Sequence, residues 1–183
     1  MINKGRYGSN DPHEKYKEGT NLVLVPEEAR QLYQPRGLKM HRKLGLPVPV
    51  IILLATLPVP RVVTHDLDIF PEGSFVNLLL VFVPLVIWLT VVLWRRVPNP
   101  FLTLTVVGVA YGVMLALGHQ LLWEARWDGV PPSLGGNLDS VLDPGLESVV
   151  LRTFTFLGSI VTGTVVGAII GLVAWVIKRV PRI

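Results

Sequence analysis

Polar stretches alternate along the chain with four long apolar runs. A helix needs about 20 predominantly apolar residues to cross the hydrocarbon core of a bilayer. The runs and their flanks predict transmembrane spans at residues 44–63, 75–94, 101–123 and 148–177. The pattern therefore predicts an all-α integral membrane protein, a four-helix transmembrane bundle that occupies residues 44–183.

The first run is the weakest of the four, because it is short and rich in proline. Four prolines interrupt it: Pro47, Pro49, Pro58 and Pro60. Proline removes a backbone donor and disrupts a helix interior. We expect residues 44–63 to form a short, kinked span, with a re-entrant or interfacial segment as the alternative. Residues 64–74, which include Asp66, are expected to form a polar connection.

Residues 1–43 form a polar amino-terminal arm with nine basic and five acidic residues. Arg36, Lys39, Arg42 and Lys43 gather just before the first apolar run. Each Lys or Arg near an anionic cytoplasmic leaflet gains about 1 kcal/mol. We therefore expect these four residues to contact anionic lipid and to anchor the topology. The alternative is an arm that docks on a specific lipid or protein.

Small residues form a ladder on one face of the fourth helix. They recur at every fourth position: Ser159, Gly163, Gly167 and Gly171. The third run repeats this spacing at Gly108 and Gly112. Such spacing lets helix backbones approach closely, which matters in a bilayer because lipid tails are as apolar as leucine. The pattern predicts that the third and fourth helices pack together through these glycines.

The composition agrees with a membrane protein and argues against disulfide-linked, thiolate-metal and nucleic-acid-binding proteins. Half of the residues are hydrophobic and only 16% are charged, with a mean hydropathy of +0.51. Soluble domains contain about 25% charged residues. The chain has no cysteine, which excludes disulfides and thiolate metal sites. The net charge of +4 follows the helix ends rather than a soluble surface, so no nucleic-acid partner is expected.

The distribution of basic residues predicts the topology. Cytoplasmic flanks of membrane helices are enriched in Lys and Arg. With four spans and both termini inside, the inner side carries fourteen basic and five acidic residues, and the outer side carries three and eight. We therefore expect a multi-pass protein of the cell membrane with both termini cytoplasmic and residues 124–147 as an external loop. If the first run does not cross the membrane, the chain has three spans, and the nine basic residues of the arm lie outside.

Polar residues gather at the predicted outer ends of the helices: Asn77, His119, Gln120, Glu124, Glu147 and Arg152. At about 100° per residue, His119 lies about 20° from Gly108 around its helix and shares the small-residue face. Ionisable groups that face a bundle interior are functional candidates because they are costly to bury. We expect an interfacial hydrogen-bond cluster, with a solute or proton site, or a histidine-ligated cofactor, as alternatives.

No phosphate-binding loop, zinc-ligand spacing or catalytic serine motif occurs, and the chain resembles no family that we recognise. We therefore predict no catalytic residue, no metal and no cofactor. The expected function is a structural or accessory subunit that associates with a second copy or with another membrane protein through its Gly-rich faces. The alternative is a small-solute or proton transporter or channel that uses the outer polar cluster.

Overall fold

The computed structural model describes residues 17–18, 21–22, 44–71, 73–127, 129–130, 132–138 and 141–180. The chain divides into two compact units, Met1–Lys39 and Met40–Ile183. In the first unit, β1 (Lys17–Glu18) pairs with β2 (Asn21–Leu22) in antiparallel fashion. The basic residues predicted to contact anionic lipid lie outside the described residues: Arg36, Lys39, Arg42 and Lys43.

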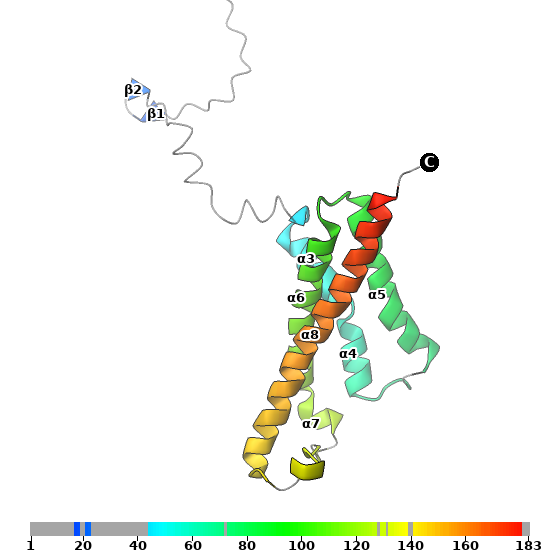
Figure 1. Ribbon diagram of the computed structural model, residues 1–183, viewed down its shortest axis with the longest axis vertical. Coiled ribbons are helices and arrows are strands. Elements are labelled where there is room, and N and C mark those ends of the chain that lie inside the picture. The colour runs from blue at the N-terminus through cyan, green and yellow to red at the C-terminus, as the bar shows by residue number, and fades with distance from the viewer. Residues whose placement is uncertain are drawn as a thin grey trace, which may run out of the picture. The chain divides into compact units, whose positions relative to one another are not determined.

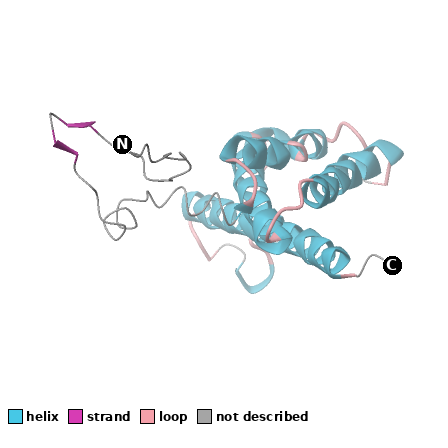
Figure 2. Cartoon of the chain, turned by 90° about the horizontal axis from the view of Figure 1, so that it is seen from above, coloured by secondary structure: helices cyan, strands magenta, loops and turns pink. Residues whose placement is uncertain are grey.

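Helices build the described part of the second unit (Figures 1 and 2). They are α3 (Val48–Thr56), α4 (Val59–Asp66), α5 (Phe75–Trp94), α6 (Pro100–Leu121), α7 (Trp123–Arg126) and α8 (Pro144–Arg179), with a 3₁₀ turn, η1, at Gly136–Leu138. Four helical segments are long and apolar enough to cross a membrane, and α3 with α4 forms the first, Val48–Asp66. The predicted helical architecture with four such segments is therefore confirmed.

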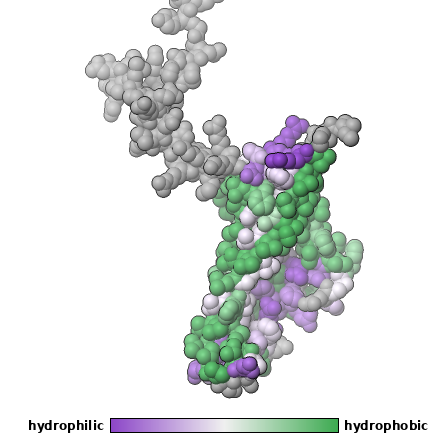
Figure 3. Space-filling view, viewed as in Figure 1, coloured by the Kyte–Doolittle hydropathy of each residue, from purple (hydrophilic) through white to green (hydrophobic). Residues whose placement is uncertain are grey.

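The ends of the helices gather at two ends of the bundle, because consecutive long segments run in opposite directions (Figure 1). At one end, Thr103 Oγ1 donates to Leu44 O at 2.7 Å and Lys178 Nζ donates to Val97 O at 2.7 Å. The cations described at this end are Arg95, Arg96, Lys178 and Arg179, so we call it the basic end. The opposite end holds α7, the ends of α4 and α6, and the start of α8, and we call it the cluster end. Figure 3 shows hydrophilic residues toward both ends of a hydrophobic body.

The first apolar segment is a helix with a single break between α3 and α4. Pro58 has no N–H to donate to the carbonyl of Leu54, one turn earlier. The carbonyl accepts instead from the N–H of Leu57 at 3.2 Å and from the indole N–H of Trp88, in α5, at 2.7 Å in the buried core. With this carbonyl satisfied, the segment continues as α4 to Asp66, beyond the end predicted at residue 63.

Helices α6 and α8 touch backbone to backbone at the small residues of the ladder. A Cβ atom added to Gly108 would lie 2.7 Å from Gly167 Cα, and one added to Gly163 would lie 2.5 Å from Gly112 Cα. Carbon atoms pack at about 3.5–4.0 Å, so no side chain fits between the helices. Gly171 and Ser159 continue the contact toward the basic end and the cluster end, and both are buried.

Capping residues fix the starts of the two helices that carry the ladder. Asn99 Oδ1 accepts from the N–H of Leu102 at 3.1 Å, and α6 begins at Pro100. Asp143 Oδ1 accepts from the N–H of Gly145 at 2.9 Å, so α8 begins at Pro144, before the start of the predicted span at residues 148–177. At 1.5 Å per residue, α8 is about 54 Å long, against about 30 Å of hydrocarbon. It therefore extends beyond the thickness of a bilayer core.

Candidate functional site

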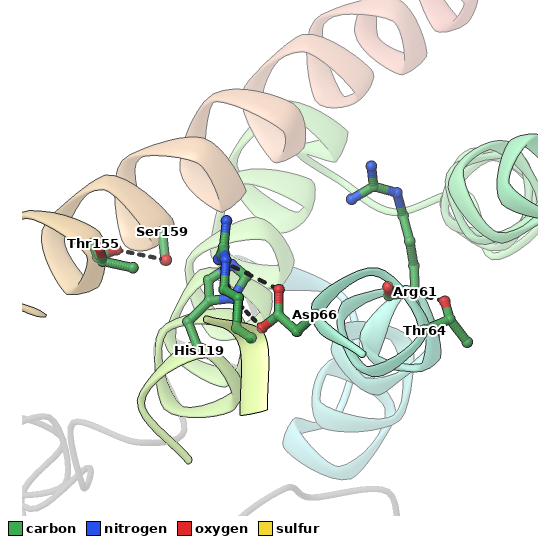
Figure 4. Close-up of polar contacts among 7 residues, drawn as sticks. Arg61, Thr64, Asp66, His119, Thr155 and Ser159 are labelled. Atoms are coloured by element: carbon green, nitrogen blue, oxygen red, sulfur yellow. Dashed lines mark hydrogen bonds and ion pairs between the residues drawn. The ribbon is translucent and has the colours of Figure 1, made fainter. Parts of the chain in front are cut away.

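Three ionisable side chains, each from a different helix, meet at the cluster end. Asp66 ends α4, His119 lies in the last turn of α6, and Arg126 ends α7. His119 Nδ1 lies 2.5 Å from Asp66 Oδ2. Arg126 Nη1 lies 3.3 Å from Asp66 Oδ1 and 3.1 Å from His119 Nδ1. Figure 4 shows Asp66 and His119 pointing toward one another, and we call the three residues the triad.

The carboxyl group of Asp66 is the most deeply buried member of the triad. Its side chain is 0% exposed, compared with 12% for His119 and 27% for Arg126. A buried carboxylate is costly unless partners compensate its charge. Within the described part of the chain, Asp66 Oδ1 accepts no hydrogen bond. It has only the charge of Arg126 beside it, so the carboxylate depends on partners from two other helices.

Packing between α4 and α6 brings Asp66 to His119. Val62 and Asp66 lie one turn apart on the buried face of α4, with exposures of 1% and 4%. Gly118 lets α4 approach, because a Cβ atom there would lie 3.0 Å from Val62 Cγ1. The next residue of α6 is His119, which therefore faces the end of α4. Because residues 64–74 were expected to form a polar connection, Asp66 was not predicted to lie on a helix. The four-residue spacing of Val62 and Asp66 is nevertheless typical of one helix face.

A single ring nitrogen of His119 faces both of its partners, and it cannot satisfy both in one protonation state. The guanidinium of Arg126 can only donate, so Nδ1 accepts from it only when Nδ1 carries no proton. If the carboxyl group carries the proton in this state, Asp66 and Arg126 compete for the one lone pair of Nδ1. When Nδ1 carries the proton, it donates to the Asp66 carboxylate, and Arg126 stays an ionic partner of that carboxylate. The triad thus offers two positions for one proton.

A second polar group at the cluster end ties α6, α7 and α8 together. Arg152 Nη2 donates to Glu124 Oε1 at 2.9 Å, and Gln120 Nε2 donates to Arg152 O at 3.0 Å. The Arg152 guanidinium lies 4.9 Å from the ring centroid of Trp123, which is buried. The structure therefore brings four of the six predicted polar residues to this end in defined contacts: His119, Gln120, Glu124 and Arg152.

The other two predicted polar residues form contacts outside these two groups. Glu147 Oε1 accepts from the N–H of Leu134 at 2.6 Å, so it fixes the loop before α8. Asn77 lies in the first turn of α5, where its N–H donates to Ser74 Oγ at 3.2 Å. Conversely, Asp66 and Arg126 belong to the site but were not among the predicted residues.

A cavity of about 380 Å³ lies beside the triad at the cluster end. The side chains that line it come from the end of α4 and from α7 with their flanks: His65, Asp66, Leu67, Asp68, Ala125, Arg126 and Trp127. Four of these residues are ionisable, so the cavity beside the triad is polar, while the Asp66 side chain itself is 0% exposed. In the opposite direction, the side chains of Trp88, Leu104 and Val107 are fully buried.

Comparison of the chain with protein-family models, with curated proteins and with solved structures finds no match. Function is therefore argued from the site itself. Among the residues that the structure describes, no group of three or more His, Cys, Asp or Glu side chains could hold a metal ion. The site consists of a carboxyl group, an imidazole and a guanidinium in mutual contact.

Proposed function

We propose that the chain is a multi-pass membrane protein that carries protons, or a small polar solute together with them, through the triad. The observation that supports this proposal is the buried carboxyl group of Asp66, which contacts His119 and Arg126 beside a polar cavity. Ionisable groups at membrane-spanning helices are costly and commonly mark ion or proton pathways. Two alternative positions for one proton are what a proton carrier requires.

The apolar middle of the bundle favours a carrier over an open pore. Trp88 and Tyr111 pack edge to face across α5 and α6, with ring centroids 6.1 Å apart. Leu104 and Val107 fill the layer beyond them toward the basic end and are 0% exposed. Water therefore has no wide path through this layer in the described conformation. A carrier meets this constraint because it exposes its site to one side at a time.

We assign the basic end to the cytoplasm by the positive-inside rule. The described residues there include four cations, Arg95, Arg96, Lys178 and Arg179, whereas Asp66, Asp68, Glu124 and Glu147 lie toward the cluster end. In this orientation the cavity opens to the outside and both termini are cytoplasmic. Reporter domains fused to each terminus should both indicate the cytoplasm. An external amino terminus with a cytoplasmic carboxy terminus would mean that Val48–Asp66 does not cross.

An accessory subunit is the second candidate, and one observation favours it. Helix α8 has an exposed apolar face: Phe154, Leu157, Val161, Val165, Ile169 and Leu172. The glycine ladder already contacts α6, so a partner would bind this other face. Under this function, substitution of Asp66 should leave assembly intact, whereas proton transport requires Asp66.

Proton flux into liposomes that contain the full-length protein distinguishes the two candidates. A potassium gradient with valinomycin drives the flux, and an enclosed pH-sensitive dye reports it. Asp66→Asn keeps the shape of the side chain and should slow the flux by roughly tenfold or more, because the proton-binding group is lost. Glu124→Gln is the matched control, since Glu124 lies at the same end but its side chain is 75% exposed. Wild-type flux equal to that of empty liposomes, or equal flux in both variants, would contradict proton transport.

A further inference from the structure

A groove at the basic end combines apolar walls with three cationic side chains. Its volume is about 780 Å³, and it lies between the end of α5, the start of α6 and the end of α8. The cations that line it are Arg96, Lys178 and Arg179, and Val92, Leu93 and Ile177 contribute apolar wall. The volume falls in the range of about 300–1,000 Å³ that is typical of sites for small molecules.

The three cations have no carboxylate partner among the described residues, where the ion pairs lie at the cluster end. Lys178 Nζ donates to Val97 O at 2.7 Å and to Pro98 O at 3.0 Å. An ammonium group has three N–H donors, so one remains for a ligand. These carbonyls hold the ammonium group at the groove without neutralising its charge.

The position of Arg179 is also fixed by its surroundings. Its guanidinium lies 4.2 Å from the ring centroid of Trp175, one turn earlier in α8. This cation–π contact restrains the side chain and leaves its charge uncompensated. Arg96 lies on the other side of the groove, in the turn after α5, and is exposed. Positive charge from two helix ends therefore converges on one groove.

The depth of the groove identifies the kind of ligand that it fits. Its apolar walls belong to Phe75–Trp94 and Pro144–Arg179, two segments able to cross a membrane, and its cations lie at their ends. An occupant must therefore be apolar along its length and anionic where the helices end. A soluble anion would gain nothing from the apolar walls, and a neutral lipid would leave the cations uncompensated. Basic pockets between membrane helices bind anionic lipid head groups in this way.

We propose that this groove binds one anionic phospholipid. Arg96, Arg179 and the remaining N–H of Lys178 contact the phosphate, because guanidinium and ammonium groups form charge-assisted hydrogen bonds with phosphate oxygens. An acyl chain lies against Leu93 and Ile177. The site is separate from the predicted contact of the amino-terminal arm with lipid, because its residues lie between positions 92 and 180.

Native mass spectrometry of the full-length protein in detergent tests the site. Phosphatidylglycerol and phosphatidylcholine with identical acyl chains are the two probes. We expect one phosphatidylglycerol per chain, bound roughly tenfold or more tightly than phosphatidylcholine, because about 1 kcal/mol is gained per cation near anionic lipid. Equal affinity for the two lipids, or no bound lipid, would overturn the proposal. Inorganic phosphate that competes equally well would also overturn it, since the walls would then contribute nothing.

Two neighbouring arginines provide matched variants. Arg96→Gln should weaken phosphatidylglycerol binding by roughly fivefold or more, because it removes a cation from the groove. Arg95→Gln removes the same charge one residue away, where the guanidinium lies 5.6 Å from the Trp94 ring, and should leave the affinity nearly unchanged. Equal losses would show that net charge alone attracts the lipid.

A third variant tests the apolar wall without changing any charge. Ile177→Trp fills part of the groove and should weaken the binding of phosphatidylglycerol, because the indole ring occupies the volume proposed for the acyl chain. Ile177 is 45% exposed, so the fold should tolerate the larger side chain. Melting temperatures measured without added lipid should match that of the wild type and verify the fold of each variant. Unchanged affinity in a folded Ile177→Trp variant would contradict the proposed position of the lipid.

Discussion

Gly167→Ala adds one methyl group at the point where α6 and α8 touch. That methyl carbon would lie 2.7 Å from Gly108 Cα and 3.0 Å from Gly108 N, and it would overlap the carbonyl oxygen of Leu104. All three atoms belong to backbone, so no side chain can rotate away. Since carbon atoms pack at about 3.5–4.0 Å, the two helices must separate by about 1 Å at this position. We therefore expect Gly167→Ala to destabilise the fold.

The magnitude follows from two opposing contributions. Overpacking of a close contact typically costs about 1–3 kcal/mol. Replacement of glycine by alanine inside a helix raises the free energy of unfolding by about 0.5–1 kcal/mol. The net loss for Gly167→Ala therefore lies between about 0 and 2.5 kcal/mol, with a midpoint of about 1 kcal/mol. Gly158→Ala adds the same methyl to the same helix, but no atom lies within 4 Å of it, so only the favourable contribution of about 0.5–1 kcal/mol remains.

Thermal unfolding of the two variants in one detergent measures this difference. We expect the melting temperature to fall for Gly167→Ala and to stay level or rise for Gly158→Ala. Gly167→Leu should lower the melting temperature further, because its larger side chain meets the same backbone. Equal shifts for the two alanine variants would refute the inference that backbone contact at the ladder holds α6 and α8 together.

Three further changes test other parts of the fold. Trp88→Phe removes the buried side-chain hydrogen bond to Leu54 O, which keeps the N–H of Leu57 as a donor, and should cost about 0.5–1.5 kcal/mol, visible as a lower melting temperature. Gly45→Ala should destabilise more than Gly129→Ala, because both glycines have positive φ, at +66° and +75°, but only Gly45 lies against neighbouring atoms. Equal melting temperatures would contradict this steric account. Glu147→Gln weakens the bond to the N–H of Leu134, so limited proteolysis should cut that loop faster; an unchanged rate would mean that the bond does not restrain the loop.

The contact between α6 and α8 was accessible to sequence reasoning because it depends on local periodicity. A four-residue spacing of small side chains produces a groove on any helix, and Gly108 and Gly163 each belong to such a spacing. The position of His119 near the buried face of its helix follows from the same angular periodicity. Residues on one regular helix keep their relative directions whatever surrounds them.

Asp66 and Arg126 could not be predicted in the same way, because tertiary packing determines their positions. Trp88 donates from α5 to the carbonyl that Pro58 leaves without its usual helical partner, and this contact between distant residues cannot be predicted from the prolines alone. Arg126 belongs to α7, a four-residue helix inside the stretch expected to be an external loop. Arg126 reaches Asp66 only because that loop folds back toward α4. The spacing of residues along the sequence does not predict such a fold.

Infrared difference spectroscopy tests directly whether Asp66 and His119 share a proton. Spectra of the full-length protein in lipid, recorded at acidic and at alkaline pH, contain a carbonyl band for each carboxyl group that gains a proton. We expect one such band to be absent in Asp66→Asn, shifted in His119→Gln and unchanged in Glu124→Gln. A wild-type spectrum from which Asp66→Asn removes no carboxyl band, or a band that His119→Gln leaves unshifted, would contradict a shared proton at this site.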